Sequence, residues 1–407
     1  MTESNAPGIL SGLKVLDIAH QYSGALTATL LGDLGASVVS IEHPAGSPIR
    51  TMLPKRNDES LWWKAVQRGK TNITLDLSCP RGRELFLSFA TQFDMLIENF
   101  RPGTLERWGI GPAELDAAGA HLALLRISGF GQTGPMRDQP GFGTVAEAMS
   151  GFAHLNGFPD GPPTFPSTTL ADGVAAIFGA FGLLAAQVAR LRDGPHGVQV
   201  VDVALFEGLF RLIPTQVLAQ QQLGQAPRRP GNFLSSHGVL RNLYQSADGR
   251  YLCVSAVGPQ AIRRVIAAPK ALDLIARLDA NVMQASPAEV EGFLIACNET
   301  LTNWASAHRY DELAAALTRE GAVFSRVYDA NDIVGDAHYR AREDLIEVPD
   351  LALGPILMPG VVPKFPGHDH HPRHAGQSRG VDNAAFYIGR LGLTQGDVAS
   401  LEQDGVI

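Results

Sequence analysis

One carboxylate, Asp172, stands alone near the start of a long apolar segment. It is the only Asp, Glu, Lys or Arg residue between Asp160 and Arg190. The apolar residues that follow it predict a buried helix beginning close to Asp172. An Asp there can cap the helix by accepting hydrogen bonds from its first N–H groups. It can equally act as a carboxylate nucleophile, since the helix dipole lowers its pKa and keeps it ionised. The local sequence leaves both interpretations open.

A second segment that could do chemistry is ENFRPGTLERW, from Glu98 to Trp108. It follows a predicted buried strand, and open α/β sheets bind ligands at the carboxyl ends of their strands. Asn99, Arg101 and Arg107 could hold phosphate groups there. A solvated loop with a helix start at Thr104 explains the same residues equally well.

Four histidines lie within the seven residues HDHHPRH, from His368 to His374. Clustered imidazoles can bind a metal ion. These histidines, however, lie among prolines and glycines, where no regular element is predicted to fix the rings. An exposed polar loop is therefore the favoured interpretation, and we expect no metal site.

The elements that must position these residues alternate between strand and helix. Strands are predicted at 14–19, 37–42, 72–77, 94–98 and 121–127, with helices at 24–34 and 80–89. This βαβ order predicts a doubly wound α/β core over roughly the first 200 residues. Ser23 and Gly24 form the first strand-to-helix turn, but the G-x-G-x-x-G fingerprint of a dinucleotide site is missing.

The later part of the chain predicts a smaller second domain. Residues 224–236 (GQAPRRPGNFLSS) have the composition of a linker. A turn and strand follow at 248–255, and alanine-rich helical sequence continues to about Glu320. A strand with a turn at 354–360 and a helix at 384–405 complete the chain.

Composition excludes several classes of function. The chain has 407 residues, 45% of them hydrophobic, as expected of a folded protein with more than one core. Its net charge of -8 without a basic run argues against nucleic acid as the main partner. Three cysteines without metal-ligand spacing suit a reducing compartment. The first residues lack the features of a signal peptide, and the apolar run Val174–Ala189 is short for a bilayer. We expect a cytoplasmic protein with no membrane partner.

In order and spacing, these segments resemble the class III CoA-transferase (CaiB/BaiF) family. The most specific runs are IENFRPG at 97–103 and SGFGQTGP at 128–135, supported by segments at 13–20, 31–42, 70–77, 171–173 and 197–203. The resemblance implies a Rossmann-like parallel-sheet large domain built from both chain ends, residues 1–223 and 331–407. It also implies a smaller inserted α+β domain at 224–330 and an interlocked homodimer.

The resemblance also assigns roles to individual residues. Asp172 matches the catalytic carboxylate that carries CoA as an aspartyl-CoA thioester between an acyl-CoA donor and a carboxylic acid. The positions implied for CoA binding are Tyr22, Ser23, His43, Leu75, Ser78, Asn99, Phe100, Arg101 and Arg107. CoA and acyl-CoA are then substrates, with succinyl-CoA as one candidate donor, and no tightly bound cofactor is expected. Arg50 is one residue that could bind the second carboxylate of a dicarboxylic acid.

An acyl-CoA racemase of the same fold is the alternative function. Racemases resemble P-G-H-D where this chain has Pro140-Gly-Phe-Gly143. Their His base therefore falls on Phe142, whose side chain cannot take a proton. This difference favours the transferase. A non-catalytic CoA-binding protein is a third option, against which Asp172 argues.

Overall fold

The computed structural model describes residues 6–194, 196–233 and 238–407. Contacts between Cα atoms divide the chain into two compact units. The large unit consists of the chain up to Ala153, Phe165–Leu223 and Ala337–Ile407. The small unit consists of His154–Thr164 and Gly224–Asp336. The last residues of the predicted linker, 234–236, lie outside the described residues.

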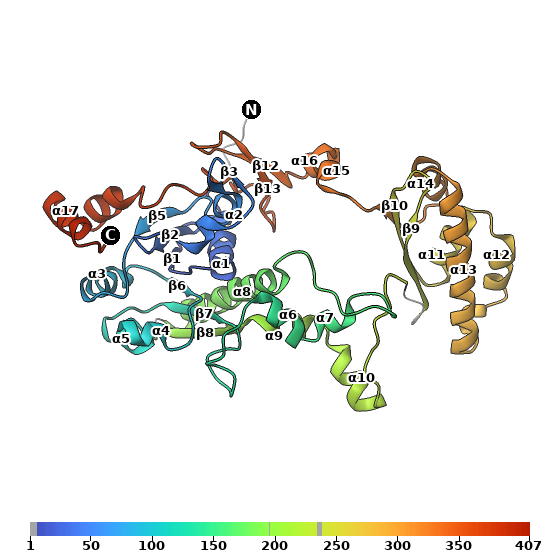
Figure 1. Ribbon diagram of the computed structural model, residues 1–407, viewed down its shortest axis with the longest axis horizontal. Coiled ribbons are helices and arrows are strands. Elements are labelled where there is room, and N and C mark those ends of the chain that lie inside the picture. Colours follow the sequence, from blue (N-terminus) through green and yellow to red (C-terminus); the bar gives the residue numbers. More distant parts are fainter. Residues whose placement is uncertain (1–5, 195, 234–237) are drawn as a thin grey trace. The chain divides into compact units, whose positions relative to one another are not determined.

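The large unit contains a six-stranded parallel sheet (Figure 1). Its strand order is β5 (Thr71–Thr74), β2 (Ser37–Glu42), β1 (Lys14–Asp17), β6 (Met95–Glu98), β7 (Ala123–Ser128) and β8 (Gln199–Ala204). The predicted α/β fold with a parallel sheet is confirmed. Because the winding direction reverses between β1 and β6, a crevice is expected where these two neighbours end.

Both faces of the sheet are apolar because side chains alternate along each strand. Val15 of β1 packs in one hydrophobic cluster and its neighbour Leu16 in the other. Residues of α1 (Tyr22–Asp33), α6 (Gly143–Met149), α8 (Leu170–Asp193) and α9 (Leu205–Leu212) join the Val15 cluster. Residues of α3 (Pro80–Ala90), α4 (Thr104–Trp108) and α5 (Pro112–Ala117) join the Leu16 cluster. Helices therefore cover the sheet on both sides.

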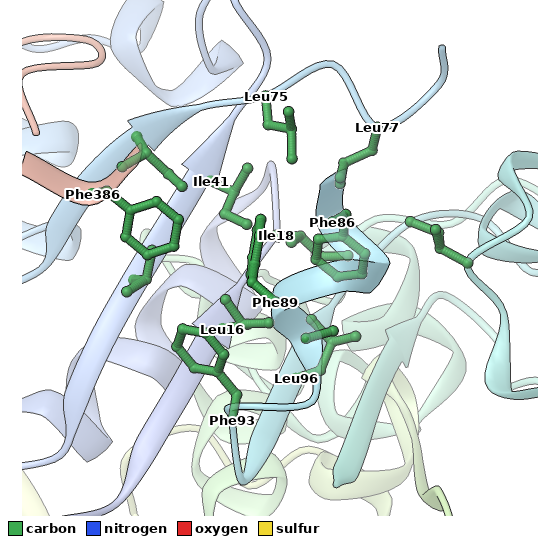
Figure 2. Packing of buried hydrophobic residues seen from close by; sticks show 14 of the residues in the cluster. Leu16, Ile18, Ile41, Leu75, Leu77, Phe86, Phe89, Phe93, Leu96 and Phe386 are labelled. Carbon is green, nitrogen blue, oxygen red and sulfur yellow. The ribbon is translucent and has the colours of Figure 1, made fainter. Parts of the chain in front are cut away.

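The end of the chain returns to this core. Figure 2 shows Phe386, from the π-helical turn η4 (Ala385–Arg390), among residues that come from the first hundred positions. Its ring meets Phe89 edge to face with centroids 5.3 Å apart. The side chain of Asn383 accepts a hydrogen bond from the Thr74 N–H at 2.9 Å, and Tyr387 Oη donates to the Thr74 carbonyl at 2.7 Å. These contacts satisfy the edge strand β5. The predicted C-terminal helix is thus two elements, η4 and α17 (Gln395–Gln403).

The small unit has its own core. Its antiparallel sheet has the order β11 (Phe324–Arg326), β10 (Tyr251–Val257) and β9 (Val239–Gln245). Its helices are α11 (Pro259–Ala267), α12 (Leu272–Asp279), α13 (Pro287–Ala307), α14 (Tyr310–Arg319) and α15 (Ala330–Gly335), with the 3-10 turn η3 (Val282–Gln284). Leu252, Phe293 and Leu313 are almost fully buried between them. Within the described residues of the chain as a whole, the elements not yet given are η1 (Pro48–Thr51), β3 (Lys55–Arg56), β4 (Glu59–Ser60), α2 (Leu61–Val66), α7 (Phe152–Leu155), α10 (Thr215–Leu223), α16 (Ala337–Ala341), β12 (Leu345–Val348) and β13 (Ile356–Pro359).

Helix α8 is longer than the apolar run suggested. Within the described ranges it is the one helix whose length and composition would allow it to cross a membrane. The expectation that this segment is too short for a bilayer was therefore wrong. Ala175, Ala176 and Leu183 are fully buried, and the helix packs against β7, β8 and α1. It is a core helix of the large unit.

Candidate active site

Asp172 is the third residue of α8, because the helix begins at Leu170 and Thr169 occupies the N-cap position. The interpretation of Asp172 as the N-cap is therefore wrong. The Thr169 side chain makes no capping hydrogen bond either. The first N–H groups of the helix need another acceptor.

Glu147 of α6 supplies that acceptor. Its Oε1 accepts hydrogen bonds from the N–H groups of Leu170 at 3.1 Å and Ala171 at 3.3 Å. The Glu147 side chain is buried. The start of α8 is thus capped by a carboxylate from a different helix, immediately before Asp172.

Gly143, one turn before Glu147 on α6, makes room for the Asp172 carboxylate. A Cβ atom at this position would overlap Asp172 Oδ2. The loop that leads into α6 is held by a second close approach, since a Cβ at Gly129 would lie 2.8 Å from the Gly141 Cα. Gly129 follows the end of β7, so Gly129, Gly141 and Gly143 bring the carboxyl end of β7 and the start of α6 together at Asp172.

The surroundings of Asp172 make it less acidic than an ordinary Asp. Burial, and then the nearby Glu147 carboxylate, raise the pKa of Asp172 to about 6. From the helix dipole alone, the sequence predicted a lowered pKa for Asp172. Burial and the neighbouring negative charge outweigh that dipole here. Asp172 is nonetheless mostly ionised at pH 7 and above.

Three cavities of the large unit adjoin one another through shared lining residues, and Asp172 lines two of them. The first, lined by Ser23, Asn99, Arg101, Pro140 and others, is named here the Arg101 cavity. The second, which includes Ile41, His43, Leu75 and Ser78, is the Leu75 cavity. The third, with Trp62, Phe165 and Thr168 in its wall, is the Thr169 cavity, of about 440 Å³.

Shared residues link the cavities in a row. His20 and Phe100 line both the Leu75 and Arg101 cavities. Their rings stack with centroids 4.7 Å apart. Asp172 and Phe142 line both the Arg101 and Thr169 cavities. A ligand extending along this row would place its middle part beside the carboxylate.

The structure brings most of the predicted CoA-binding residues to this row. Ser23, Asn99, Phe100 and Arg101 line the Arg101 cavity, Tyr22 lines the Thr169 cavity, and His43, Leu75 and Ser78 line the Leu75 cavity. Arg107 lies outside these three cavities, and its Nη2 donates to Thr104 Oγ1 at 2.8 Å.

Asn99 also has a structural role. Its Oδ1 accepts from the His20 N–H at 3.1 Å, and its Nδ2 donates to the Gln21 carbonyl at 3.2 Å. These bonds tie the loop after β6 to the loop after β1. The two loops that form the row of cavities are therefore held together by this side chain.

Several residues of the site were not predicted from the sequence. His20, Gln21, Gly143 and Glu147 all line cavities that contain Asp172. The four-residue spacing between Gly143 and Glu147 places both on one face of a helix, and was the available signal. Nothing in the sequence indicated which helix that face would meet.

Arg50 and the histidine cluster at His368–His374 are two other features singled out in the sequence. Arg50 pairs with Glu42 through two hydrogen bonds of 2.8 and 2.6 Å, and its guanidinium lies 3.5 Å from the Trp63 ring centroid. The Arg50 side chain therefore has a structural role. In the parts of the chain that the structure describes, no group of three or more His, Cys, Asp or Glu residues is arranged to hold a metal ion.

Comparison with known proteins identifies the family. The model of CoA-transferase family III matches residues 10–382. The chain is 35% identical to succinyl-CoA–D-citramalate CoA-transferase of Chloroflexus aurantiacus, over 100% of both chains. It is 33% identical to acetyl-CoA:oxalate CoA-transferase of Acetobacter aceti, over 90% of this chain and 92% of that one. A crystal structure of a CaiB/BaiF family protein from Brucella suis superimposes with a TM-score of 0.80 at 26% identity, covering 94% of this chain and 100% of that one. The resemblance seen in the sequence is confirmed: the protein belongs to CoA-transferase family III.

Proposed function

We propose that this CoA-transferase moves CoA from an acyl-CoA donor to a carboxylic acid through a covalent intermediate on Asp172. The observation that carries the proposal is an ionisable carboxylate at the junction of the Arg101 and Thr169 cavities. Relatives named succinyl-CoA CoA-transferases make succinyl-CoA a candidate donor.

The proposed reaction needs no proton transfer. The Asp172 carboxylate attacks the thioester carbonyl, so that a mixed anhydride forms and the CoA thiolate leaves. The thiolate then attacks the Asp172 carbonyl, which releases the donor acid and leaves an aspartyl-CoA thioester. The acceptor carboxylate attacks that thioester, and the expelled thiolate attacks the acceptor's acyl carbon in the new anhydride. The new acyl-CoA departs and Asp172 is free again.

The cavities suggest how the substrates lie. In the proposal, the nucleotide end of CoA occupies the Leu75 cavity with His43, Leu75 and Ser78 around it. The pantetheine arm passes His20 and Phe100 into the Arg101 cavity, beside Ser23, Asn99 and Arg101. The acyl group and the acceptor acid enter the Thr169 cavity, where Tyr22 lies. Arg107, on α4, which follows the loop that carries Asn99 and Arg101, would contact a phosphate of CoA.

The covalent step can be tested by trapping. The protein is incubated with succinyl-CoA and no acceptor, and then treated with hydroxylamine. An aspartyl thioester reacts to give a hydroxamate, which peptide mass spectrometry should find at Asp172 only when the donor was present. A donor-independent signal, or none, would contradict the covalent route.

We further propose that residues 1–223 and 331–407 form the CoA-binding large domain and 224–330 a small domain of a cytoplasmic homodimer. The large unit leaves much apolar surface uncovered on α8, α9 and α10: Ile177, Phe181, Phe210, Leu212 and Leu218 are 46 to 69% exposed. Apolar surface of this extent is typical of subunit interfaces.

The dimer gives a testable expectation. Light scattering should give the mass of two chains for the wild type, and that of one chain when Ile177 and Phe181 are both changed to Asp. Leu272→Asp, at an exposed position on α12 of the small unit, serves as the matched control and should leave the mass unchanged. A wild-type mass of one chain would contradict the proposal.

Phe142 gives a clear expectation for the racemase alternative. This residue lies beside Asp172 in both of its cavities, where a racemase would need a base. Incubation with a 2-methylacyl-CoA in D2O should therefore leave the α-carbon unlabelled by NMR. Deuterium incorporated at a rate comparable to CoA transfer would favour the racemase instead.

A further inference from the structure

Glu147 is a buried charged residue in a cavity that Asp172 also lines, and the proposed mechanism gives it no role. It is 2% exposed, and among the described residues no Lys or Arg side chain forms an ion pair with it. Burying a carboxylate without a cation is costly unless hydrogen bonds stabilise the charge. Here the N–H groups of Leu170 and Ala171 provide them.

The geometry connects Glu147 to Asp172 in two ways. The hydrogen bonds fix the two residues that precede Asp172 in the first turn of α8. One turn earlier on α6, the Gly143 backbone lies against the Asp172 carboxylate. The same face of α6 thus holds the backbone of the nucleophile and bounds its side chain.

We propose that Glu147 is a positioning residue for CoA transfer, which holds the first turn of α8 so that the Asp172 carboxylate faces the thioester. The proposal rests on the proposed role of Asp172. A carboxylate used as the cap has a second effect that a neutral cap would lack, because its charge lies close to the nucleophile. That charge favours the protonated form of Asp172 and so makes its ionised form a better nucleophile.

None of the other groups that line the two cavities of Asp172 places a second negative charge beside it. Among the residues that line its two cavities, Glu147 is the one other carboxylate. Tyr22, from α1, is kept neutral because burial raises the pKa of its phenol. Burial lowers the pKa of the His20 imidazole, in the loop after β1. Arg101, after β6, is the cation that faces the site.

Two substitutions of Glu147 distinguish the effect of its hydrogen bonds to α8 from the effect of its negative charge. Glu147→Gln keeps an oxygen that can accept from the Leu170 and Ala171 N–H groups but removes the charge. The pKa of Asp172 should fall, so the acidic limb of the pH profile of kcat should move to lower pH. Glu147→Ala removes the acceptor as well, and we expect kcat to fall roughly 10- to 100-fold with little change in the KM for acyl-CoA.

The controls make the test decisive. Glu84→Gln, on the exposed surface of α3, makes the same chemical change far from α8 in sequence and should alter neither kcat nor its pH profile. If Glu147→Gln folds with the wild-type unfolding temperature and keeps the wild-type pH profile, the electrostatic role is refuted. If Glu147→Ala also keeps the wild-type kcat, the positioning role is refuted too. Failure of Asp172 itself would be visible separately, as the absence of hydroxamate in the wild type.

Discussion

Replacing Asp172 with Ala is expected to reduce CoA transfer by at least about 10⁴-fold, because the variant lacks the group that forms the covalent intermediate. Binding of acyl-CoA should persist, since Ser23, Asn99 and Arg101 line the same cavity and are untouched. Steady-state assays with succinyl-CoA and a panel of acids would measure the loss. Calorimetric titration with CoA would show that the site remains.

The fold should tolerate this change well. Glu147, rather than Asp172, accepts the hydrogen bonds of the first turn of α8. The variant should therefore have a normal circular dichroism spectrum. An Ala variant that retains more than a few per cent of the wild-type kcat would show that another group carries CoA.

The nearly isosteric Asp172→Asn variant gives a matching expectation for stability. The folded-state pKa of Asp172, about 6, lies above the ordinary Asp value of 3.8. Keeping this carboxylate ionised therefore costs stability at pH 7, by up to about 3 kcal/mol. The cost disappears as the pH falls below the unfolded pKa, because both states are then protonated. Asp172→Asn should raise the unfolding temperature at pH 7.5 and have much less effect near pH 3.5, where the wild type no longer has a buried charge.

The sheet of the large unit could be predicted from the sequence because its signal is local. Strands β1, β6 and β7 are built on consecutive apolar residues, and the helices between the strands impose parallel pairing. The strand at 37–42 was predicted to the residue. The first strand ends at Asp17, two residues before its predicted end, because the chain turns there toward the site.

The candidate site was only partly predictable, because its decisive contacts join segments that are distant in sequence. Asp172 was found from its isolation in an apolar segment. Its cap, Glu147, belongs to another helix, and no pattern in either segment predicts that the two helices meet. The direction of the Asp172 pKa depended on the same missing information. The helix dipole can be inferred from one helix, whereas burial and a neighbouring carboxylate require the tertiary structure.

Gly143→Ala should be the most damaging substitution in the site that leaves every ionisable group in place. A Cβ at this position would overlap Asp172 Oδ2. The carboxylate ends a short flexible side chain, so it should rotate away while α6 and α8 keep their backbone positions. We expect kcat to fall about 100-fold, since displacing a reacting group by about 1 Å has that effect. The KM for acyl-CoA should change little.

Gly173→Ala is the matched control, because it makes the same change next to Asp172 on α8 where a new Cβ would meet no atom within 4 Å. Both glycines lie in helices, where Ala is the better helix former, so neither variant should lose stability from its backbone. A loss of activity in Gly143→Ala alone would therefore report the position of the Asp172 carboxylate rather than the state of the fold. Hydroxamate trapping should slow by the same factor as kcat if the first attack is the affected step. Equal activity of the two variants would show that the Asp172 carboxylate reacts from a position other than the one beside Gly143.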